Sequence, residues 1–139
     1  MDLAERISAH FGATCVPGLV SVYLFGSHAE GRAHRESDVD IGVLFDRGEL
    51  PTKKDRFDRS LQLAADLRVA LSSESIDLVV LNDAPPLLGR RIITEGVRLH
   101  CSDSEGDHAF VRDVQLRAAD IQPFLERMRK IKHEALAPR

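Results

Sequence analysis

One stretch, residues 20–45, constrains the fold of this chain more than any other, because two apolar runs there flank a polar segment. The runs are Val20–Phe25 and Ile41–Phe45, and both are rich in β-branched and aromatic residues. Runs of this length and composition predict two buried strands. Gly26 and Ser27 stand where the first strand ends and a helix is expected to start. A helix start presents unpaired N–H groups and a partial positive charge, so this junction suits a phosphate group.

Asp38 and Asp40 lie at the entrance of the second strand. Because side chains alternate along a strand, both carboxylates are expected on the same face, roughly 7 Å apart. Such a pair repels itself, and desolvating it unpaired costs several kcal/mol per ion. A divalent cation removes that cost, and oxygen-only ligands favour magnesium or manganese.

This stretch resembles the signature of the DNA polymerase beta nucleotidyltransferase superfamily, namely Gly26-Ser27, ten further residues and Asp38-x-Asp40. The resemblance extends to the minimal branch of that superfamily (MNT), the antitoxins of HEPN/MNT toxin–antitoxin pairs, through Ala29, Gly31 and Ser37. The motif covers about a fifth of the chain. A lone Gly-Ser or Asp-x-Asp is weak evidence, whereas the combination between two strands is fairly specific.

The resemblance implies a fold, a reaction and a set of site residues. The implied fold is α+β, a small mixed sheet backed by helices in layers. The implied reaction moves a nucleoside monophosphate, AMP from ATP, to a hydroxyl group with two Mg²⁺ ions, or Mn²⁺ in their place. Asp38 and Asp40 would hold the metal ions together with a third carboxylate on a later strand, which matches Asp77 here. Gly26 and Ser27 would bind the triphosphate.

Simpler structural roles remain open for these residues. Gly26-Ser27 also fits a turn with a helix cap, and Asp38 fits a turn at the strand entrance, although that leaves Asp40 unexplained. Asp77 also fits an ordinary acid at a strand edge.

The loop between the two strands departs from the family pattern. Relatives often carry Arg directly after Gly-Ser and again before the second glycine, where this sequence has His28 and Glu30, with Arg32 beyond Gly31. This weakens the positive charge expected near the triphosphate. His28 and His34 are interpreted as solvated, because oxygen ligands already suffice for the metal.

Periodicity and turn residues predict the remaining elements. We expect helices over 2–11, at 27–31, from Thr52 to Leu71, from Asp83 to Gly96 and, as a C-terminal segment, over about 107–133. Strands are expected over Val20–Phe25, Val39–Phe45, Ile76–Leu81 and Val97–Cys101. Pro123 predicts a kink or a break between two helices, and residues beyond Lys130 are expected to fray. Two apolar stripes are expected to face the core: Phe57, Leu61, Ala64, Ala65 and Leu71, and then Phe110, Val114, Ile121, Leu125 and Met128.

Length and composition bound the remaining questions. The 139 residues predict one domain over 1–139, and 43% hydrophobic with 29% charged residues is ordinary for a globular protein. The net charge of −3 disfavours nucleic acid as a partner. Cys15 and Cys101 are interpreted as buried thiols. The N-terminus lacks a signal-peptide core and no apolar run reaches membrane-spanning length, so we expect a cytoplasmic protein.

The expected function is therefore that of a minimal nucleotidyltransferase whose acceptor, by the resemblance, is a hydroxyl, often of tyrosine, on a HEPN toxin. Two alternatives stay open: an antitoxin that blocks the toxin by contact without chemistry, and transfer to a small molecule. Homo-oligomer formation and the base of the nucleotide are not determined by the sequence.

Overall fold

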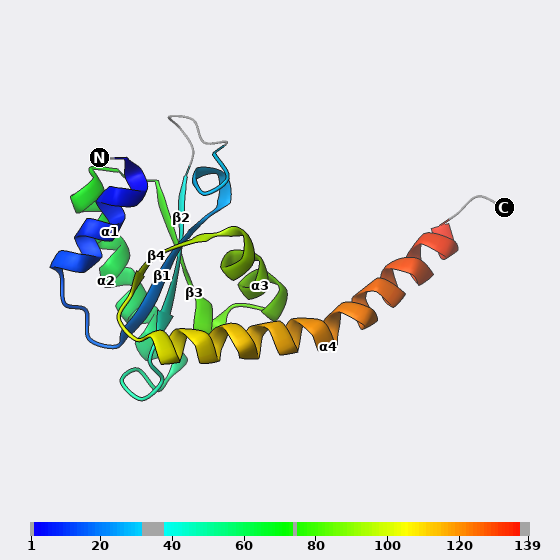
Figure 1. Cartoon of the computed structure of the whole chain (residues 1–139). Coiled ribbons are helices and arrows are strands. Elements are labelled where there is room, and N and C mark those ends of the chain that lie inside the picture. Colours follow the sequence, from blue (N-terminus) through cyan, green and yellow to red (C-terminus); the bar gives the residue numbers. More distant parts are fainter. Residues whose placement is uncertain (1, 32–37, 74, 137–139) are drawn as a thin grey trace.

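A four-stranded mixed sheet lies at the centre of the computed structural model, between two layers of helices (Figure 1). The structure describes residues 2–31, 38–73 and 75–136. The strands are β1 (Leu19–Phe25), β2 (Val39–Phe45), β3 (Ile76–Val80) and β4 (Val97–Cys101), in the spatial order β3-β2-β1-β4. β1 runs antiparallel to β2 and β4, whereas β2 and β3 are parallel. The predicted α+β fold with a small mixed sheet is confirmed.

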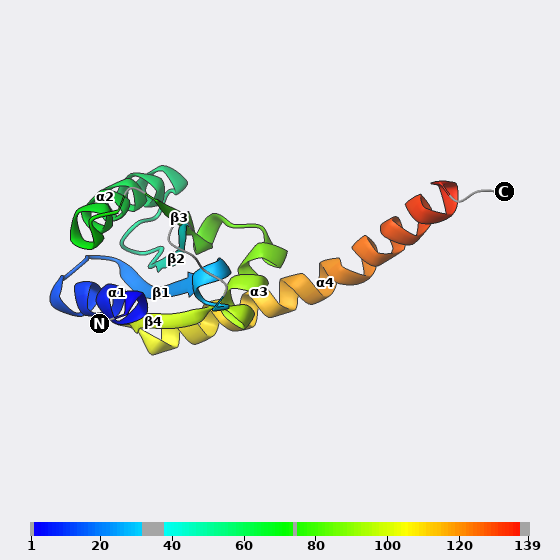
Figure 2. The ribbon, with the colours of Figure 1, turned by 90° about the horizontal axis from the view of Figure 1, so that it is seen from above.

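The helices divide between the two faces of the sheet (Figures 1 and 2). α1 (Leu3–Ala13) and α2 (Lys53–Leu71) cover one face, and α3 (Pro86–Glu95) and the first half of α4 (Ser104–Leu136) cover the other. The alternation along β2 follows this division. Its odd-numbered residues join the core cluster beneath α1 and α2, and Leu44 joins the cluster beneath α3. The two faces of β2 therefore differ, as alternation predicts.

Several element boundaries differ from the prediction by a few residues. α1 passes through Gly12 to Ala13, because its buried residues Ile7 and Phe11 hold the helix against the core and one glycine costs only about 1 kcal/mol. β1 begins one residue early, at Leu19, and β3 ends one residue early, at Val80. The helix expected from Asp83 begins at Pro86, because Asp83 belongs to a short 3₁₀ turn.

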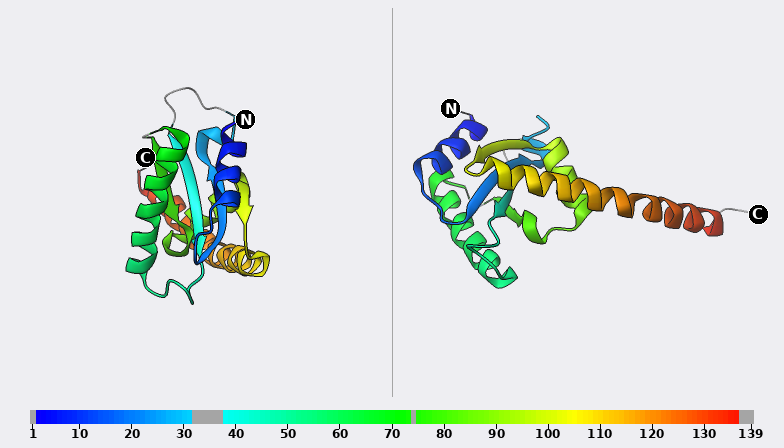
Figure 3. Two further views of the ribbon diagram at one scale, coloured as in Figure 1. Left: turned by 90° about the vertical axis from the view of Figure 1, so that its left-hand side faces the viewer. Right: turned by 60° about the horizontal axis from the view of Figure 1, so that its bottom comes forward.

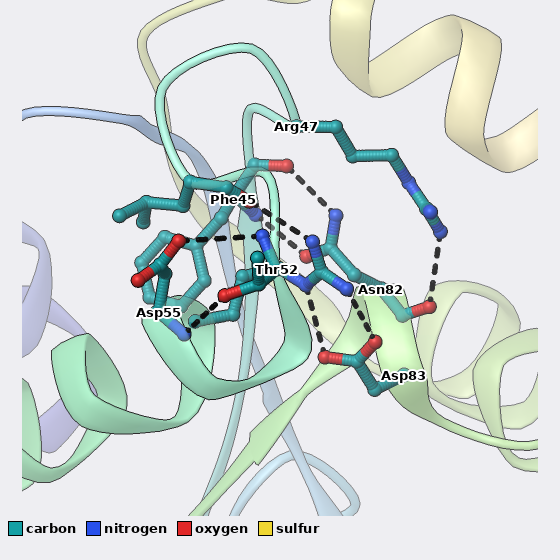
Figure 4. Close-up of polar contacts among 8 residues, drawn as sticks. Phe45, Arg47, Thr52, Asp55, Asn82 and Asp83 are labelled. Atoms are coloured by element: carbon teal, nitrogen blue, oxygen red, sulfur yellow. Dashed lines mark hydrogen bonds and ion pairs between the residues drawn. The ribbon is translucent and has the colours of Figure 1, made fainter.

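The face that α2 buries is the clearest error of the prediction. Phe57 and Leu61 are 57% and 55% exposed, and Ala65 is exposed too, although Ala64 and Leu71 are buried as expected. The helix instead buries Arg56, Ser60, Leu63, Ala64, Leu67 and Leu71. The predicted capping box is present: Thr52 Oγ1 accepts from the Asp55 N–H, and the Asp55 carboxylate accepts from the Thr52 N–H (Figure 4).

Polar contacts explain why α2 turns this face inward. The Arg56 guanidinium donates to both carboxylate oxygens of Asp83, at 3.0 and 2.9 Å, and to the Leu50 carbonyl at 2.9 Å. Next to this pair, the Asn82 side chain exchanges two hydrogen bonds with the backbone of Phe45 (Figure 4). A charged residue can be buried when its donors are satisfied in this way. Apolar periodicity alone cannot predict such an arrangement.

α4 is one continuous helix that begins at Ser104 and runs through Pro123 to Leu136, well beyond Lys130. It begins early because Asp103 accepts hydrogen bonds from Gly106 and Asp107. Pro123 and the preceding turn at Ala119 are exposed, so water can satisfy the carbonyl that the proline leaves unpaired. The helix leaves the body of the molecule (Figures 1 and 3). Its predicted core stripe is buried at Val114, half-buried at Phe110, Ile121 and Leu125, and exposed at Met128.

The base of α4 is fixed by a buried carboxylate. Asp107 is 1% exposed and accepts hydrogen bonds from Ser21 Oγ and Tyr23 OH on β1, both at 2.7 Å, and from Arg98 on β4 at 3.0 Å. Burial and the hydrogen bond to Asp107 raise the pKa of the Tyr23 phenol, which stays a donor at physiological pH. The buried charge is thus fully paired.

The cysteines differ from the prediction, because Cys15 is exposed rather than buried and Cys101 is half-buried. Across the described ranges, no helix combines the length and apolar character that a membrane span requires.

Candidate active site

The candidate site lies at the end of the sheet where β1 leaves and β2 enters. Gly26 follows β1 with φ +75°, a left-handed backbone conformation that residues with a side chain rarely adopt. A Cβ atom at this position would also overlap Oδ2 of Asp40. Both the backbone conformation and the close carboxylate therefore require glycine here. The two halves of the sequence motif meet because Phe25 and Asp40 are partners in the β1–β2 ladder.

Asp77 joins the site through the parallel pairing of β2 and β3. Asp40 and Asp77 are register partners, one step after Val39 and Ile76. Register partners in neighbouring strands direct their side chains to the same face. The two strands carrying these acids are therefore neighbours, as a shared metal site requires.

The carboxylates disturb one another electrostatically. Burial, and then the charges of Asp77 and Asp38, raise the pKa of the Asp40 carboxyl, while His28 and Arg91 lower it. The ionised form of Asp40 is thus held against desolvation and like charge. A bound cation would relieve this repulsion, and carboxylate oxygens are the ligands that Mg²⁺ and Mn²⁺ prefer.

Asp38 precedes β2, whereas Asp40 and Asp77 lie within strands. It is exposed, directly before the first residue of β2, and it is close enough to affect Asp40. Among the residues the structure describes, no three His, Cys, Asp or Glu side chains converge as a ready-made metal site. The donor chemistry nevertheless fits a divalent cation held by the half-buried Asp40 and the two exposed acids, Asp77 and Asp38.

The segment after Gly26 is not the helix that the sequence predicts. Residues Gly26–His28 form a 3₁₀ turn, in which the carbonyl of Gly26 accepts from Ala29 and Glu30. Gly31 is again left-handed, with φ +71°. Two left-handed glycines enclose too few residues to nucleate an α-helix. A phosphate would therefore meet the N–H group and the hydroxyl of the half-buried Ser27 in a tight turn, since the N–H groups of Ala29 and Glu30 are bonded within the turn. Arg32, His34 and Ser37 lie outside the described residues.

Arg91 is a residue near the site that the sequence analysis missed. It lies on α3, and its charge opposes the raised pKa of Asp40. Its neighbour Ile92 packs against Gly42 of β2, two residues from Asp40, which orients this part of α3 toward the site. Arg91 also pairs with Glu95 at 3.3 Å on the helix surface. No motif in the sequence indicates this arrangement, because it depends on how α3 packs on the sheet.

Comparisons with known proteins agree with this geometry. The family model described as polymerase beta, nucleotidyltransferase, matches residues 16–105. The protein adenylyltransferase MntA of Shewanella oneidensis is 33% identical over 103 residues, which are 73% of this chain and 68% of that protein. A crystal structure of a toxin–antitoxin with AMP-PNP matches with a TM-score of 0.63 and 28% identity, covering 91% of this chain and 98% of the other.

A further solved structure, the MntA–HepT toxin–antitoxin, matches with a TM-score of 0.57 and 26% identity over 92% of this chain and 98% of the other. The matched family region spans β1 to β4 and therefore includes Gly26, Ser27, Asp38, Asp40 and Asp77. From this match and its site geometry, the chain belongs to the polymerase beta nucleotidyltransferase family.

Proposed function

We propose that this chain transfers AMP from ATP to a hydroxyl group of a HEPN-type toxin and acts as the antitoxin of that pair. The observation that carries the proposal is the register pairing of Asp40 and Asp77 beside Gly26, in a chain of a nucleotidyltransferase family. The related MntA is a protein adenylyltransferase, and two of the structural neighbours are toxin–antitoxin complexes. Use of ATP places the pair, in this proposal, in the cytoplasm.

The residues divide the chemistry between them. The acceptor oxygen attacks the α-phosphorus of ATP, the bond from that phosphorus to the bridging oxygen breaks, and pyrophosphate leaves. Asp77 would receive the proton of the acceptor hydroxyl. The N–H group and hydroxyl of Ser27 would bind the leaving phosphates, and catalysis would rest mainly on positioning and charge.

Asp38, Asp40 and Asp77 would hold Mg²⁺ in this proposal. Mg²⁺ supplies positive charge for the attacking and leaving oxygens when it is bound. Without Mg²⁺, the negative charges that raise the pKa of Asp40 would also repel a bound triphosphate. We therefore expect ATP affinity to depend on Mg²⁺, measured by calorimetry with the ion and again with excess chelator. Equal affinity in both would contradict the metal assignment.

The proposal expects the partner toxin to be encoded in the adjacent reading frame, and that protein is the acceptor in the test. Incubated with this chain, ATP and Mg²⁺, the toxin should gain the mass of one or more AMP groups, located by peptide mass spectrometry. Asp77→Ala should still bind ATP but suppress the transfer, whereas Asp66→Asn, an exposed acid on α2, should transfer normally. If the wild-type chain binds and silences the toxin without adding mass, the antitoxin acts by contact alone.

A further inference from the structure

A groove of about 390 Å³ runs along the outer edge of the sheet, between α2 and the start of α3. Its walls are mainly apolar and come from Phe57 and Leu61 of α2, Leu78 and Val80 of β3, and Leu88 of α3. Asp77 also lines it. We call this surface the β3 groove. It therefore begins at the candidate active site and follows β3 away from it.

The floor of the β3 groove is a strand edge. β3 is the terminal strand of the sheet, and no described strand pairs with its outer side. The Ser75 carbonyl accepts from the Val39 N–H on β2, so alternation directs the backbone groups of Ile76, Leu78 and Val80 outward. Arg68 of α2 reaches the outward Ile76 carbonyl at 3.4 Å. The backbone groups of Leu78 and Val80 follow along the same edge, as acceptors and donors for another strand.

The wall formed by α2 is unusually apolar for an exposed surface. Phe57 and Leu61 are one helical turn apart and more than half exposed, because Arg56 and Ser60 take the buried positions beside them. Large apolar side chains next to a free strand edge are typical of a docking surface for an extended segment. Such a segment would cover both side chains while pairing with Leu78 and Val80.

The position of Asp77 indicates which extended segment the β3 groove binds. A strand added to β3 would lie beside Asp77, the residue that would receive the acceptor proton. At about 3.3 Å per residue, the five residues of β3 match an extended segment of about five residues. A second copy of this chain pairing β3 with β3 would instead cover Asp77 in both copies and block the acceptor. The groove therefore suits the chain that carries the acceptor.

We propose that the β3 groove binds the acceptor-bearing segment of the partner toxin as an added β-strand, which brings its hydroxyl to Asp77. This inference rests on the proposed function for the identity of the occupant. It explains how a chain of 139 residues selects a protein acceptor: the strand edge supplies affinity through backbone hydrogen bonds, and the apolar wall supplies side-chain specificity.

Two measurements test the proposal with the full chain and the toxin. Amide hydrogen exchange should slow at Leu78 and Val80 when the toxin is added. The double variant Phe57→Gln with Leu61→Gln should raise the KM for toxin at least tenfold, with little change in kcat. ATP affinity, which the groove does not set, should stay the same. The matched control is Val69→Gln, which is on the same helix, 81% exposed and outside the groove.

The outcomes separate this inference from the proposed function. Unchanged exchange at Leu78 and Val80 in the toxin complex would overturn the docking site, as would a wild-type KM in the double variant. Protection that rises with the concentration of this chain alone would overturn it in favour of a second copy. If the wild-type chain transfers no AMP, the proposed function fails, and the exchange measurement still decides the docking site.

Discussion

At the scale of single residues, the site is defined by like charges that act on one another at the start of β2 and β3. Asp40 overlies Gly26, pairs in register with Asp77 and lies near Asp38. Burial and the charges of Asp77 and Asp38 destabilise the ionised carboxylate of Asp40 in the absence of a cation. The cluster therefore costs stability, and an ordinary structural role for Asp40 does not account for it.

Asp40→Asn should therefore raise the melting temperature in chelator while abolishing transfer. The folded-state pKa of Asp40 is raised, so the stability associated with its protonated form is lost as pH rises through that pKa. The gain from asparagine should be largest near neutral pH and vanish below the pKa of an unfolded aspartate, about 4. Thermal melts across this range, with Asp66→Asn as the control, measure it. A large loss of stability would mean that Asp40 is structural.

Arg91→Gln should weaken ATP binding, because Arg91 is a cation close to Asp40 and the loop has His28 and Glu30 where relatives often carry arginine. The KM for ATP should rise about threefold to fivefold, as expected for an exposed charge contributing ~1 kcal/mol. Arg90→Gln is the matched control, since the Arg90 guanidinium donates to Gln122 on α4 instead. Equal KM values for the two variants would exclude a role for Arg91.

At the scale of elements, the buried pair of Arg56 and Asp83 sets the rotation of α2. The side chains are 5% and 18% exposed and join the helix to the turn after β3. This rotation leaves Phe57 and Leu61 on the surface, and so it forms one wall of the β3 groove. The stability of the core and the shape of the groove thus depend on the same ion pair.

Arg56→Ala should destabilise the fold by about 3–5 kcal/mol, because it leaves a partly buried carboxylate without its partner. The hydrogen bond from Arg56 lowers the pKa of Asp83, so the stability from this pair is present above the pKa of an unfolded aspartate and lost as pH falls through the folded value. Urea unfolding at neutral and acidic pH measures both effects. Arg117→Ala, which removes an exposed pair with Asp113 on α4, should cost only about 0.5 kcal/mol.

At the scale of the whole molecule, α4 extends from the body as a single helix (Figure 3). Its base is held by Asp107, and its middle packs through Val114 and Ala118. From residue 126 to 136 every position is exposed. The outer half therefore adds little to the stability of the body.

Deletion of residues 127–139 should change the free energy of unfolding by no more than about 0.5 kcal/mol, as is usual for exposed positions. Val114→Ala, on the buried part of the same helix, should cost about 2 kcal/mol. Chemical denaturation of both variants tests the division of α4 into an anchored and an exposed half. A comparable loss in the deletion variant would mean that the outer half packs on the body in solution.

The sequence by itself determined the features that depend on local spacing. Alternation in residues 39–45 correctly separated the two faces of β2, and the Thr52–Asp55 box, the strand β4 and the helix end at Gly96 follow from neighbouring residues. The Gly26–Asp40 pair could be predicted from the sequence, because a short connection between antiparallel strands brings the two strand ends together. Asp77 could be identified as a site residue only through the family resemblance, because its pairing with Asp40 depends on a crossover between parallel strands.

The tertiary structure decided whatever depends on partners distant in sequence. Apolar periodicity in α2 fits two faces, and the observed one also buries Arg56, whose partner Asp83 lies 27 positions further along the chain. Arg91 reaches the site because Ile92 packs on Gly42, a contact that no local pattern encodes. Pro123 predicts a break, yet the helix continues because exposed backbone can bond to water. Side-chain contacts across the sheet and exposure to solvent are properties of the folded chain. They therefore determine the shape of the β3 groove, the position of Arg91 near Asp40 and the length of α4.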